Sequence, residues 1–408
     1  MAATDSISIH NQFSGAVEAR LQPLTILVLF PSQLLTDNRP HGDGRLAWGY
    51  IRALAERGHT LHVAARNVDF VEPTPPNVFV YPLSCSRSSE TLLERLRFMR
   101  SVRTLIRKLH TRFDLVHELN PVYRGVSLSL LDQHVPLVLG PFPPAWPPDS
   151  GATLDVGITR YFPAPLKRRV AELQQSRASA LLLMTPAAID RVARPGGGRI
   201  FELPPGLDID FFQPHPELYD GKPSILFLAN LNRRKGIFTL LEALVLVRER
   251  ISEARLTIAG GGAEYAIVSK QIADMGLAGS VEMVGEVPRA SVPALMAKHS
   301  VYCLPSYGEP FATSVLEAMA CGRPVVITNA GGLPSVVSEA GGRLATPRDP
   351  HTLASALVEV LGSRVLQESM GQHNRNAMVE RFSWSRVADQ LEHIYQTVLQ
   401  EKRAKVVA

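Results

Sequence analysis

Apolar and polar residues form two successive series of predicted strands and helices along the chain. The strands are short Val-, Ile- and Leu-rich runs bounded by turn residues, and the stretches between them have helical periodicity. The first series has strands at 24–30, 59–66, 77–83, 114–119 and 136–140, with helices at 46–57 and 92–113. The second series has strands at 223–231, 254–262, 280–287, 301–306 and 324–332, with helices at 238–251, 291–299 and 314–322. Alternating strands and helices predict parallel βαβ units, and therefore two doubly wound α/β domains.

A stretch rich in Pro, Asp and Gly, 203–223, separates the two series and predicts a hinge. The C-terminal stretch 383–405 predicts one amphipathic helix, because its apolar side chains recur on one face. Those side chains are Trp384, Val387, Leu391, Ile394 and Val398. The predicted organisation is a flexible lead 1–22, an N-terminal Rossmann-like domain 23–205, a hinge 206–222, a C-terminal Rossmann-like domain 223–382 and a terminal helix 383–408. Ligands of such sheets bind beyond the carboxyl ends of the strands, so a central cleft between the two domains is expected.

The composition fits a soluble globular protein, because 45% of the 408 residues are hydrophobic and 20% are charged. The apolar runs are far shorter than the ~20 residues of a membrane-spanning helix. The first 20 residues lack a secretory-signal pattern, so we expect a cytoplasmic protein. Three cysteines, Cys85, Cys303 and Cys321, show no paired spacing, which disfavours disulfides and a Cys-rich zinc site.

The net charge of +5 is uneven along the chain. Residues 1–205 contain 23 Lys and Arg against 17 Asp and Glu, whereas the remainder contains 20 against 21. The basic character therefore belongs to the first half, and points to an acidic surface or substrate near it.

The segment 307–326 contains the residues that say most about a possible ligand site. Glu309 lies in a loop at a predicted strand end, and Ser314 begins a predicted helix. A helix N-terminus presents unpaired N–H groups, so Thr313 and Ser314 could hold a phosphate through their backbone. Glu309 would then stand beside the group attached to that phosphate, and Glu317 could reach a diol such as a ribose. The alternative is two solvated glutamates flanking a buried helix.

This segment resembles the E-x7-E signature of the retaining glycosyltransferases of family 4, which have the GT-B fold. Further pieces are similar to that family in the same order, and the resemblance is strongest over 203–395. They are 204–214, 227–236, 256–262, 284–296, 304–311, 325–337 and 382–395. The resemblance implies two Rossmann-like domains facing a central cleft, with the terminal helix crossing back to the first. It also implies a nucleotide-sugar donor on the second domain, an acceptor on the first, and no obligatory metal or other cofactor.

The resemblance further implies roles for particular residues. Glu309, His117 and Lys235 are the expected catalytic residues, and Glu309 would orient the sugar. Lys235, with Arg233 or Arg234, would stabilise the leaving diphosphate. The expected donor-binding residues are Gly42, Gly44, Asn230, Arg233, Arg234, Lys235, Gly285, Val287, Glu309, Phe311, Ala312, Thr313, Ser314 and Glu317. Simpler interpretations stay open. They are an ordinary βα turn at Gly42 and Gly44, a satisfied histidine at a strand end for His117, an exposed basic turn at 233–235 and simple turn packing at Gly285 and Val287.

The chain departs from the family pattern at four positions. Asn230 stands where an arginine is usual, Leu119 where some members have a second histidine, Ala312 for glycine and Ser335 for glutamate. These departures leave open whether the protein is active and which of Arg233 and Arg234 meets the diphosphate.

A basic amphipathic pattern covers residues 92–113. Its apolar positions at helical spacing are Leu92, Leu96, Met99, Val102, Ile106, Leu109 and Phe113. Seven basic residues lie among them against one acid, Glu94, and 166–170 adds a second basic cluster. Such a helix can lie on an anionic membrane surface, and a sheet-packing helix with a solvated basic face is the alternative. Nucleic acid is not expected as a partner, because aromatic residues do not interleave with the charges.

The sequence thus predicts a retaining glycosyltransferase that moves a sugar from a nucleotide-diphosphate sugar to an acceptor such as a lipid or a polysaccharide precursor. A GT-B nucleotide-sugar epimerase and a non-catalytic nucleotide-sugar-binding protein are the alternatives. UDP-glucose, UDP-N-acetylglucosamine and GDP-mannose all stay open as donors. The expected location is the cytoplasm, with the inner face of the membrane as a peripheral option.

Overall fold

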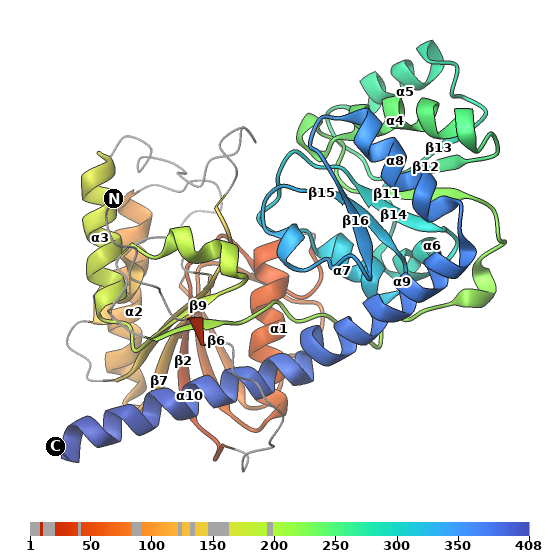
Figure 1. Ribbon diagram of the computed structural model, residues 1–408. Helices are drawn as coiled ribbons and strands as arrows, with labels where there is room; N and C mark the ends of the chain where they lie inside the picture. The colour runs from red at the N-terminus through yellow and green to blue at the C-terminus, as the bar shows by residue number, and fades with distance from the viewer. Residues whose placement is uncertain are drawn as a thin grey trace, which may run out of the picture. The chain divides into compact units, whose positions relative to one another are not determined.

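The structure, a computed structural model, describes residues 9–10, 21–39, 42–83, 92–120, 125–130, 135–145, 163–193 and 199–407 (Figure 1). The chain divides into two compact units. The first contains the described residues up to 144, those from 163 to 206, and those from 384 onward. The second contains Leu207–Ser383.

An eight-stranded parallel sheet forms the centre of the first unit, in the order β1-β10-β9-β8-β7-β2-β4-β6. The strands are β1 (Ile9–His10), β10 (Arg199–Glu202), β9 (Ala180–Leu183), β8 (Leu137–Phe142), β7 (Leu115–Glu118), β2 (Thr25–Phe30), β4 (Thr60–Ala65) and β6 (Val78–Pro82). A separate pair consists of β3 (Leu35–Thr36) and β5 (Val68–Asp69). Val28 of β2 is in register with Val63 of β4 and His117 of β7. The central strand β2 is buried on both faces, as expected of a parallel sheet covered by helices.

Helices cover both faces of this sheet. They are α1 (Gly42–Glu56), α2 (Leu92–Leu109), α3 (Ala164–Ser176) and α10 (Trp384–Val407), with the 3-10 turns η1 (Val126–Leu130) and η4 (Pro186–Arg191). Ile26, Val28 and Phe30 of β2 share a core with α1 and α10. Leu27 and Leu29 share a core with α2 and η1. This division follows from the alternation of side chains along a strand.

The predicted apolar face of α10 is confirmed. Val387, Leu391, Ile394 and Val398 are buried in the core of the first unit. Trp384 packs against the same core, and its indole lies close to the backbone of Gly49. The terminal helix therefore belongs to the first unit, although the chain reaches it from the second.

The face that α2 buries agrees with the predicted one over the second half of the helix, where Val102 is buried and Ile106 and Leu109 pack against the same core, but differs from it over the first half. Phe98 and Val102 are its fully buried apolar residues, whereas Leu96 is 41% exposed. Glu94 is buried too, and its Oε2 lies 3.2 Å from Arg66 Nη2. Residues four apart lie on one side of a helix, so the row that contains Glu94, Phe98 and Val102 meets the sheet. The helix also ends at Leu109 rather than at 113, and His110 follows with a φ of 47°.

A six-stranded parallel sheet forms the centre of the second unit, in the order β13-β12-β11-β14-β15-β16. The strands are β13 (Val281–Gly285), β12 (Arg255–Ala259), β11 (Ser224–Leu228), β14 (Val301–Leu304), β15 (Val325–Thr328) and β16 (Gly342–Ala345). The helices are α4 (Ile237–Arg250), α5 (Tyr265–Asp274), α6 (Val292–Ala297), α7 (Thr313–Ala320), α8 (Pro350–Leu361) and α9 (Arg364–Ala377). Short turns are η5 (Pro216–Leu218), η6 (Arg233–Lys235), η7 (Arg289–Ser291), η8 (Leu333–Ser335) and the π-helix η9 (Met378–Phe382). Strand β16 escaped the sequence interpretation, because it is short and lies at the sheet edge.

Residues 207–222, part of the predicted hinge, pack on the second unit. Leu207 and Phe212 are buried in its core, and Leu207 N donates to Phe382 O at 2.6 Å. Ser383, the first residue of the predicted terminal helix, pairs with Leu207 in an isolated parallel bridge. The chain thus enters the second unit at Leu207 and leaves it after Ser383 along two adjacent segments.

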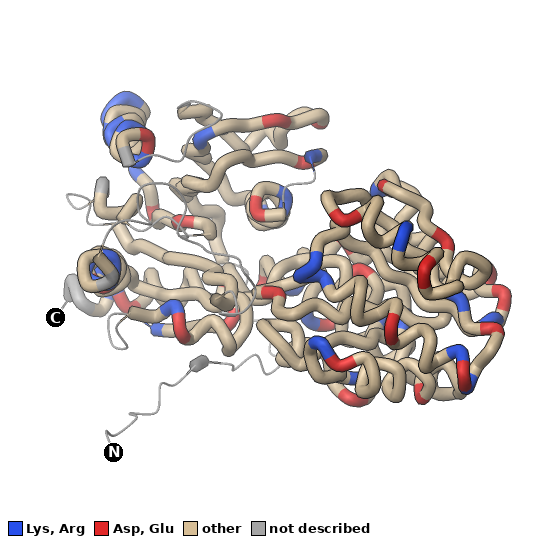
Figure 2. The backbone as a smooth tube through the Cα atoms, turned by 90° about the horizontal axis from the view of Figure 1, so that it is seen from above, with Lys and Arg blue, Asp and Glu red and all other residues tan. Residues whose placement is uncertain are grey.

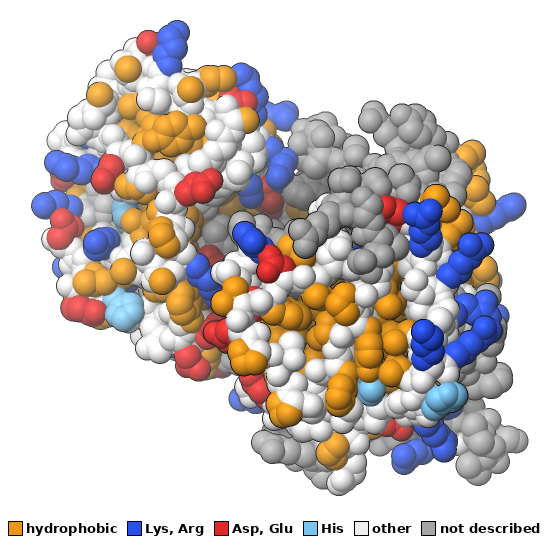
Figure 3. All heavy atoms as spheres, turned by 180° about the vertical axis from the view of Figure 1, so that it is seen from behind, with side chains coloured by type: hydrophobic (Ala, Val, Ile, Leu, Met, Phe, Trp, Pro, Cys, Tyr) orange, Lys and Arg blue, Asp and Glu red, His pale blue; other side chains and the backbone are white. Residues whose placement is uncertain are grey.

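Acidic and basic residues are mixed over the second unit (Figure 2), in keeping with its near-neutral sequence. In the first unit, Figure 3 shows Lys and Arg side chains gathered along one edge. No helix among the described residues is both long and apolar enough to cross a membrane.

Candidate functional site

Loops at the carboxyl ends of neighbouring strands come together in the second unit. Strands β11, β14 and β15 are adjacent in the sheet. The loop 229–236 follows β11, the loop 305–312 follows β14, and 329–332 follows β15. Parallel strands place these loops on one edge, which is where open α/β sheets bind ligands.

Glu309 is the centre of this group of loops. Its Oε1 lies 2.5 Å from Arg234 Nη1 and 2.9 Å from Lys235 Nζ. Glu309 is 3% exposed, whereas the side chains of Arg234 and Lys235 keep 23% and 16% of their exposure. Two cations around one carboxylate leave excess positive charge in a half-buried position. We call Glu309, Arg234 and Lys235 the charged triad.

The local fold of 232–236 explains how both cations reach Glu309. Asn232 caps the turn η6, because its Oδ1 accepts a hydrogen bond from Lys235 N at 3.2 Å. Gly236 has a φ of 75°, and a Cβ there would lie 1.8 Å from the Pro305 carbonyl oxygen. Only glycine permits so close an approach of the two loops. Tyr307 N donates to Arg234 O at 2.8 Å, which fixes the loops together a second time.

The backbone of Glu309 is held from the other side by the loop after β15. Gly332 N donates to Glu309 O at 2.9 Å, and Gly331 pairs with Glu309 in an isolated bridge. Gly331 has a φ of 76°, and a Cβ on it would lie 2.0 Å from Glu309 O. The glycine pair therefore fixes the main chain of Glu309 while its side chain contacts the cations.

The structure distinguishes the two arginines that the sequence left equivalent. Arg233 is 72% exposed in its side chain, and its Nε lies 3.4 Å from Glu264 Oε1. Arg234 contacts Glu309 instead. Asn230, in the place of the family arginine, is exposed, and its Oδ1 accepts from Asn232 Nδ2 at 3.4 Å. Of the two arginines, Arg234 is therefore the one that contacts Glu309.

The helix α7 begins directly after Phe311 and Ala312. Ala312 is buried and makes no side-chain cap, so the first N–H groups of α7 receive no bond from it. Thr313 is exposed, and Ser314 Oγ accepts a hydrogen bond from Tyr302 OH at 2.8 Å. Phe311 packs against the core of the unit. A phosphate here could therefore meet the backbone N–H groups and the Thr313 hydroxyl, while Ser314 Oγ already accepts from Tyr302.

Glu317 has a charged neighbour that the sequence interpretation missed. Arg289 Nη1 lies 4.0 Å from Glu317 Oε1, and the Arg289 guanidinium lies 4.6 Å from the ring centroid of Phe211. Arg289 comes two residues after Val287, so its place beside the predicted donor-binding residues Gly285 and Val287 was a usable signal. Gly285 in that loop has a φ of 71°, with open space where a Cβ would be.

The remaining predicted residues lie in the first unit. Gly42 begins α1 and is exposed, whereas Gly44 is buried two residues later. His117 is fully buried, with Nδ1 2.6 Å from Tyr395 OH and Nε2 3.0 Å from Gly140 O. Burial lowers the pKa of His117 to about 4. Both ring nitrogens are engaged, so these contacts support a packing role, and the catalytic role of His117 stays a prediction.

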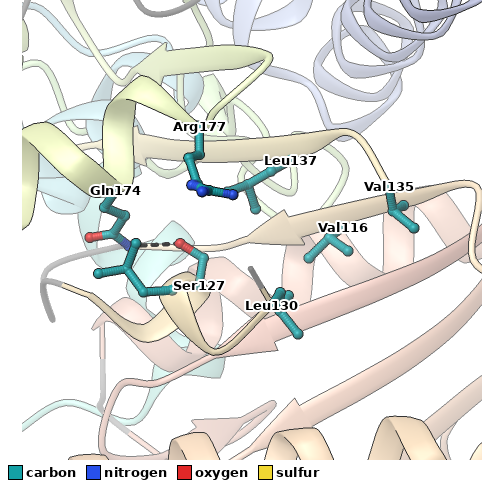
Figure 4. Close-up of a pocket in the computed structure, with 8 residues that line it drawn as sticks. Val116, Ser127, Leu130, Val135, Leu137, Gln174 and Arg177 are labelled. Carbon is teal, nitrogen blue, oxygen red and sulfur yellow. Dashed lines mark hydrogen bonds between the residues drawn. The ribbon is translucent and has the colours of Figure 1, made fainter. Parts of the chain in front are cut away.

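A small pocket of about 60 Å³ lies in the first unit between β7, β8, η1 and α3 (Figure 4). Ser127 and Gln174 form its polar side, and Gln174 Nε2 donates to Ser127 Oγ at 3.0 Å. Gln174 Nε2 also donates to Glu118 Oε2, which accepts from Ser127 N as well, each at 3.0 Å. Burial raises the pKa of Glu118 to about 7. The sequence interpretation did not single out this carboxyl group.

Within the described part of the chain, no group of three or more His, Cys, Asp or Glu side chains could hold a metal ion. Cys303 and Cys321 are free and buried, and burial raises the pKa of both thiols.

Two family patterns match consecutive parts of the chain. The pattern described as Glycosyltransferase Family 4 matches residues 41–211, and the one described as Glycosyl transferases group 1 matches 208–377. Together they span residues 41–377, which include most of both compact units.

Curated relatives match most of the chain. A phosphatidyl-myo-inositol mannosyltransferase of Mycobacterium leprae is 28% identical over 364 residues, which cover 86% of this chain and 92% of the relative. An MMP alpha-(1->4)-mannosyltransferase of Mycolicibacterium hassiacum is 30% identical over 308 residues, covering 70% and 71%.

Solved structures share the fold. Sucrose-phosphate synthase from Thermosynechococcus elongatus superposes with a TM-score of 0.72 at 21% identity, over 92% of this chain and all of that one (100%). The Anabaena protein HepE in complex with UDP superposes with a TM-score of 0.69 at 19% identity and the same coverage, 92% and 100%. These proteins support the architecture of two parallel-sheet α/β units that the sequence predicted.

Proposed function

Because this chain belongs to glycosyltransferase family 4, the glycosyl transferases group 1 with the GT-B fold, we propose that it transfers a hexose with retention of anomeric configuration. It is a glycosyltransferase that acts on nucleotide sugars. The stereochemistry of transfer, the catalytic residues, the donor and the acceptor are the properties that we propose.

The charged triad is the observation that carries the proposal. Glycosyl transfer from a nucleotide-diphosphate sugar builds negative charge on the leaving diphosphate. Preorganised cations at a water-poor position stabilise such charge strongly. Lys235 and Arg234 supply two of them, and Glu309 lies between them within contact distance. Glu309 would grip the sugar hydroxyls, and Glu317 would bind the ribose of the nucleotide.

No metal is needed in this proposal, because the two cations take over the charge stabilisation that a divalent ion supplies in other enzymes. The test is transfer measured with and without a chelator. We expect equal rates, and loss of activity that a divalent cation restores would contradict this part.

For the donor, we propose a mannosyl nucleotide as the first candidate. The supporting observation is that the two curated relatives above are both described as mannosyltransferases. One further relative, at 32% identity over 206 residues, is described as GDP-mannose-dependent. For the acceptor, we propose a lipid presented at an anionic membrane surface.

The exposed side of α2 supports the membrane part. Arg97, Arg100, Arg103, Arg107 and Lys108 are exposed on this helix. Leu93 and Leu96 are exposed beside them, at 53% and 41%. Leucines next to arginines on one helix fit a surface that meets both acyl chains and anionic headgroups.

The experiment is a transfer assay with the full-length protein and three donors, GDP-mannose, UDP-glucose and UDP-N-acetylglucosamine, over lipid and saccharide acceptors. The anomeric configuration of the product is read by NMR. We expect an α-linked product from the α-linked donor. A β-linked product would overturn retention, and a changed sugar from donor incubated without acceptor would favour the epimerase.

Glu309→Ala tests the proposed site in the same assay. We expect it to abolish transfer without preventing folding, as judged by circular dichroism. Full turnover by the variant would remove Glu309 from the site.

A further inference from the structure

We propose that Glu309 occupies, in the donor-free protein, the place that the donor's diphosphate takes between Arg234 and Lys235, and that donor binding exchanges one anion for the other. This inference rests on the proposed function, because it concerns the same site. It adds a property of the resting protein: the cations are held ready by an internal counter-ion.

The contacts of the Glu309 carboxylate support this exchange. One oxygen, Oε1, contacts both Arg234 Nη1 and Lys235 Nζ, at 2.5 and 2.9 Å. A single carboxylate oxygen thus bridges the two cations. A diphosphate offers several anionic oxygens and can accept from both cations at once.

Charge balance also supports the exchange. Two cations face one carboxylate, so the triad carries excess positive charge. Half-buried charges attract counter-ions more strongly than exposed ones, because solvent screens them less. A diphosphate with a negative charge on each phosphate would neutralise both cations. The exchange is therefore favourable for the donor.

The main chain of Glu309 can stay in place during the exchange. The main chain of Glu309 is held by the glycine pair 331–332 through the Gly332 N–H and the close approach of Gly331. Exchange therefore needs only a side-chain rotation of Glu309, which frees the carboxylate for the sugar hydroxyls. The same event binds the diphosphate and makes the sugar-binding group available.

The experiment compares the wild type with Glu309→Gln, using UDP and GDP as probes and calorimetry as the readout. The amide keeps the size of the side chain but removes its charge, so the two cations lose their internal anion. We expect Glu309→Gln to bind the preferred nucleoside diphosphate about tenfold more tightly, a difference of about 1.4 kcal/mol. Binding of the same nucleoside without phosphates should not change.

The matched control is Glu264→Gln. Glu264 pairs with Arg233, which lies on the same loop as Arg234 and Lys235. The variant therefore removes an equal charge close by without touching the triad. We expect its nucleoside diphosphate affinity to stay within about twofold of the wild type. An equal gain in both variants would show a general field effect and overturn the exchange.

A double variant tests the pairing directly. When Arg234 is already replaced by Gln, Glu309→Gln should increase the nucleoside diphosphate affinity less than it does in the wild type. The reason is that Arg234, one of the two cations that Glu309→Gln would free, is then missing. Contacting residues show such non-additivity. Thermal unfolding gives a second readout: Glu309→Gln should melt lower without ligand and gain more from the nucleotide.

The outcomes separate this inference from the proposed function. Unchanged or weaker nucleoside diphosphate binding by a folded Glu309→Gln overturns the exchange, even if the wild type transfers sugar. Failure of both UDP and GDP to bind either protein also overturns it. Tighter binding by Glu309→Gln, together with no transfer by the wild type from any donor, would uphold the exchange and contradict the transferase mechanism.

Discussion

At the residue scale, Lys235 is the cation whose contribution to transfer can be measured most directly. We expect Lys235→Ala to lower kcat by about 10²- to 10³-fold, the usual effect of removing one preorganised donor to a charged transition state. Steady-state kinetics on the preferred donor would measure it.

Arg233→Ala is the matched comparison for that substitution. Arg233 lies two residues away but pairs with Glu264, so we expect a much smaller loss. A larger loss from Arg233→Ala than from Lys235→Ala would reverse the assignment of the two side chains.

Glu118 gives a prediction about pH. Burial raises its pKa to about 7 in the folded protein, above the 4.5 of the free group. The folded state therefore holds the proton more tightly. This contribution to stability is fully present below about pH 4.5 and is lost as the pH rises through about 7.

Glu118→Gln should remove the loss of stability that accompanies rising pH, because the neutral amide imitates the protonated acid. We expect the variant to melt higher than the wild type at pH 8, with a smaller difference at pH 5. Thermal unfolding at both pH values measures this. The prediction is contradicted if the melting temperature of the wild type, relative to that of the variant, is higher at pH 8 than at pH 5.

His117 illustrates what burial does to a motif residue. The sequence places it at the end of a strand, where a catalytic histidine would also lie. The fold surrounds it with Tyr395 from α10 and Gly140 from β8. These partners are 278 and 23 residues away, so no local pattern could have indicated them.

At the element scale, the start of α10 is fixed by a tight fit of one aromatic ring. A Cβ on Gly49 of α1 would lie 1.9 Å from the Trp384 ring, and one on Gly206 would lie 2.2 Å from it. The Tyr50 ring meets the same indole edge-on, with centroids 5.2 Å apart. Glycine at 49 and 206 is thus required by packing of the terminal helix.

We expect Gly49→Ala to destabilise the protein by about 1–3 kcal/mol, the usual cost of overpacking a core. The better helix propensity of alanine works against this and is smaller, at most about 1 kcal/mol. Thermal unfolding would measure the sum. Gly279→Ala is the control, since no atom lies within 4 Å of a Cβ there, and an equal loss in both would contradict the packing argument.

The helix α2 shows why periodicity predicted an element but only part of its buried face. Leucines and arginines alternate so densely over 92–109 that more than one apolar stripe can be drawn. Tertiary contacts selected the stripe with Phe98 and Val102, and used the buried Arg66–Glu94 pair beside it. Leu93 and Leu96 were left outside.

At the scale of the whole molecule, the uneven charge of the chain leads to a prediction about membranes. We expect the full-length protein to sediment with anionic vesicles and not with neutral ones. Each Lys or Arg near an anionic surface contributes about 1 kcal/mol. Replacing Arg97, Arg100 and Arg107 by Gln should therefore weaken vesicle binding by roughly two orders of magnitude.

The control removes the same charge elsewhere. Arg250, Arg255 and Lys270 are exposed on the second unit, and their replacement by Gln should leave vesicle binding nearly unchanged. Equal effects of the two triple variants would show that only net charge matters. Absence of binding to anionic vesicles by the wild type would remove the membrane surface from the proposal.

The sequence by itself determined the alternation of strands and helices, the parallel α/β class and the family. These properties depend on local hydrophobic period, turn residues and short motifs, all of which are written along the chain. It also predicted Glu309 and Lys235 as site residues, because their loops follow predicted strands directly, and Glu317 on the helix that follows the loop of Glu309.

Only the tertiary structure decided which charged side chains meet. Arg234 rather than Arg233 contacts Glu309 because Gly236 and Pro305 bring two loops together across 75 residues of chain. Arg289 lies beside Glu317, and His117 is enclosed by the terminal helix, for the same kind of reason. The direction of a side chain depends on which distant backbone packs against it, and that information exists only once the chain has folded.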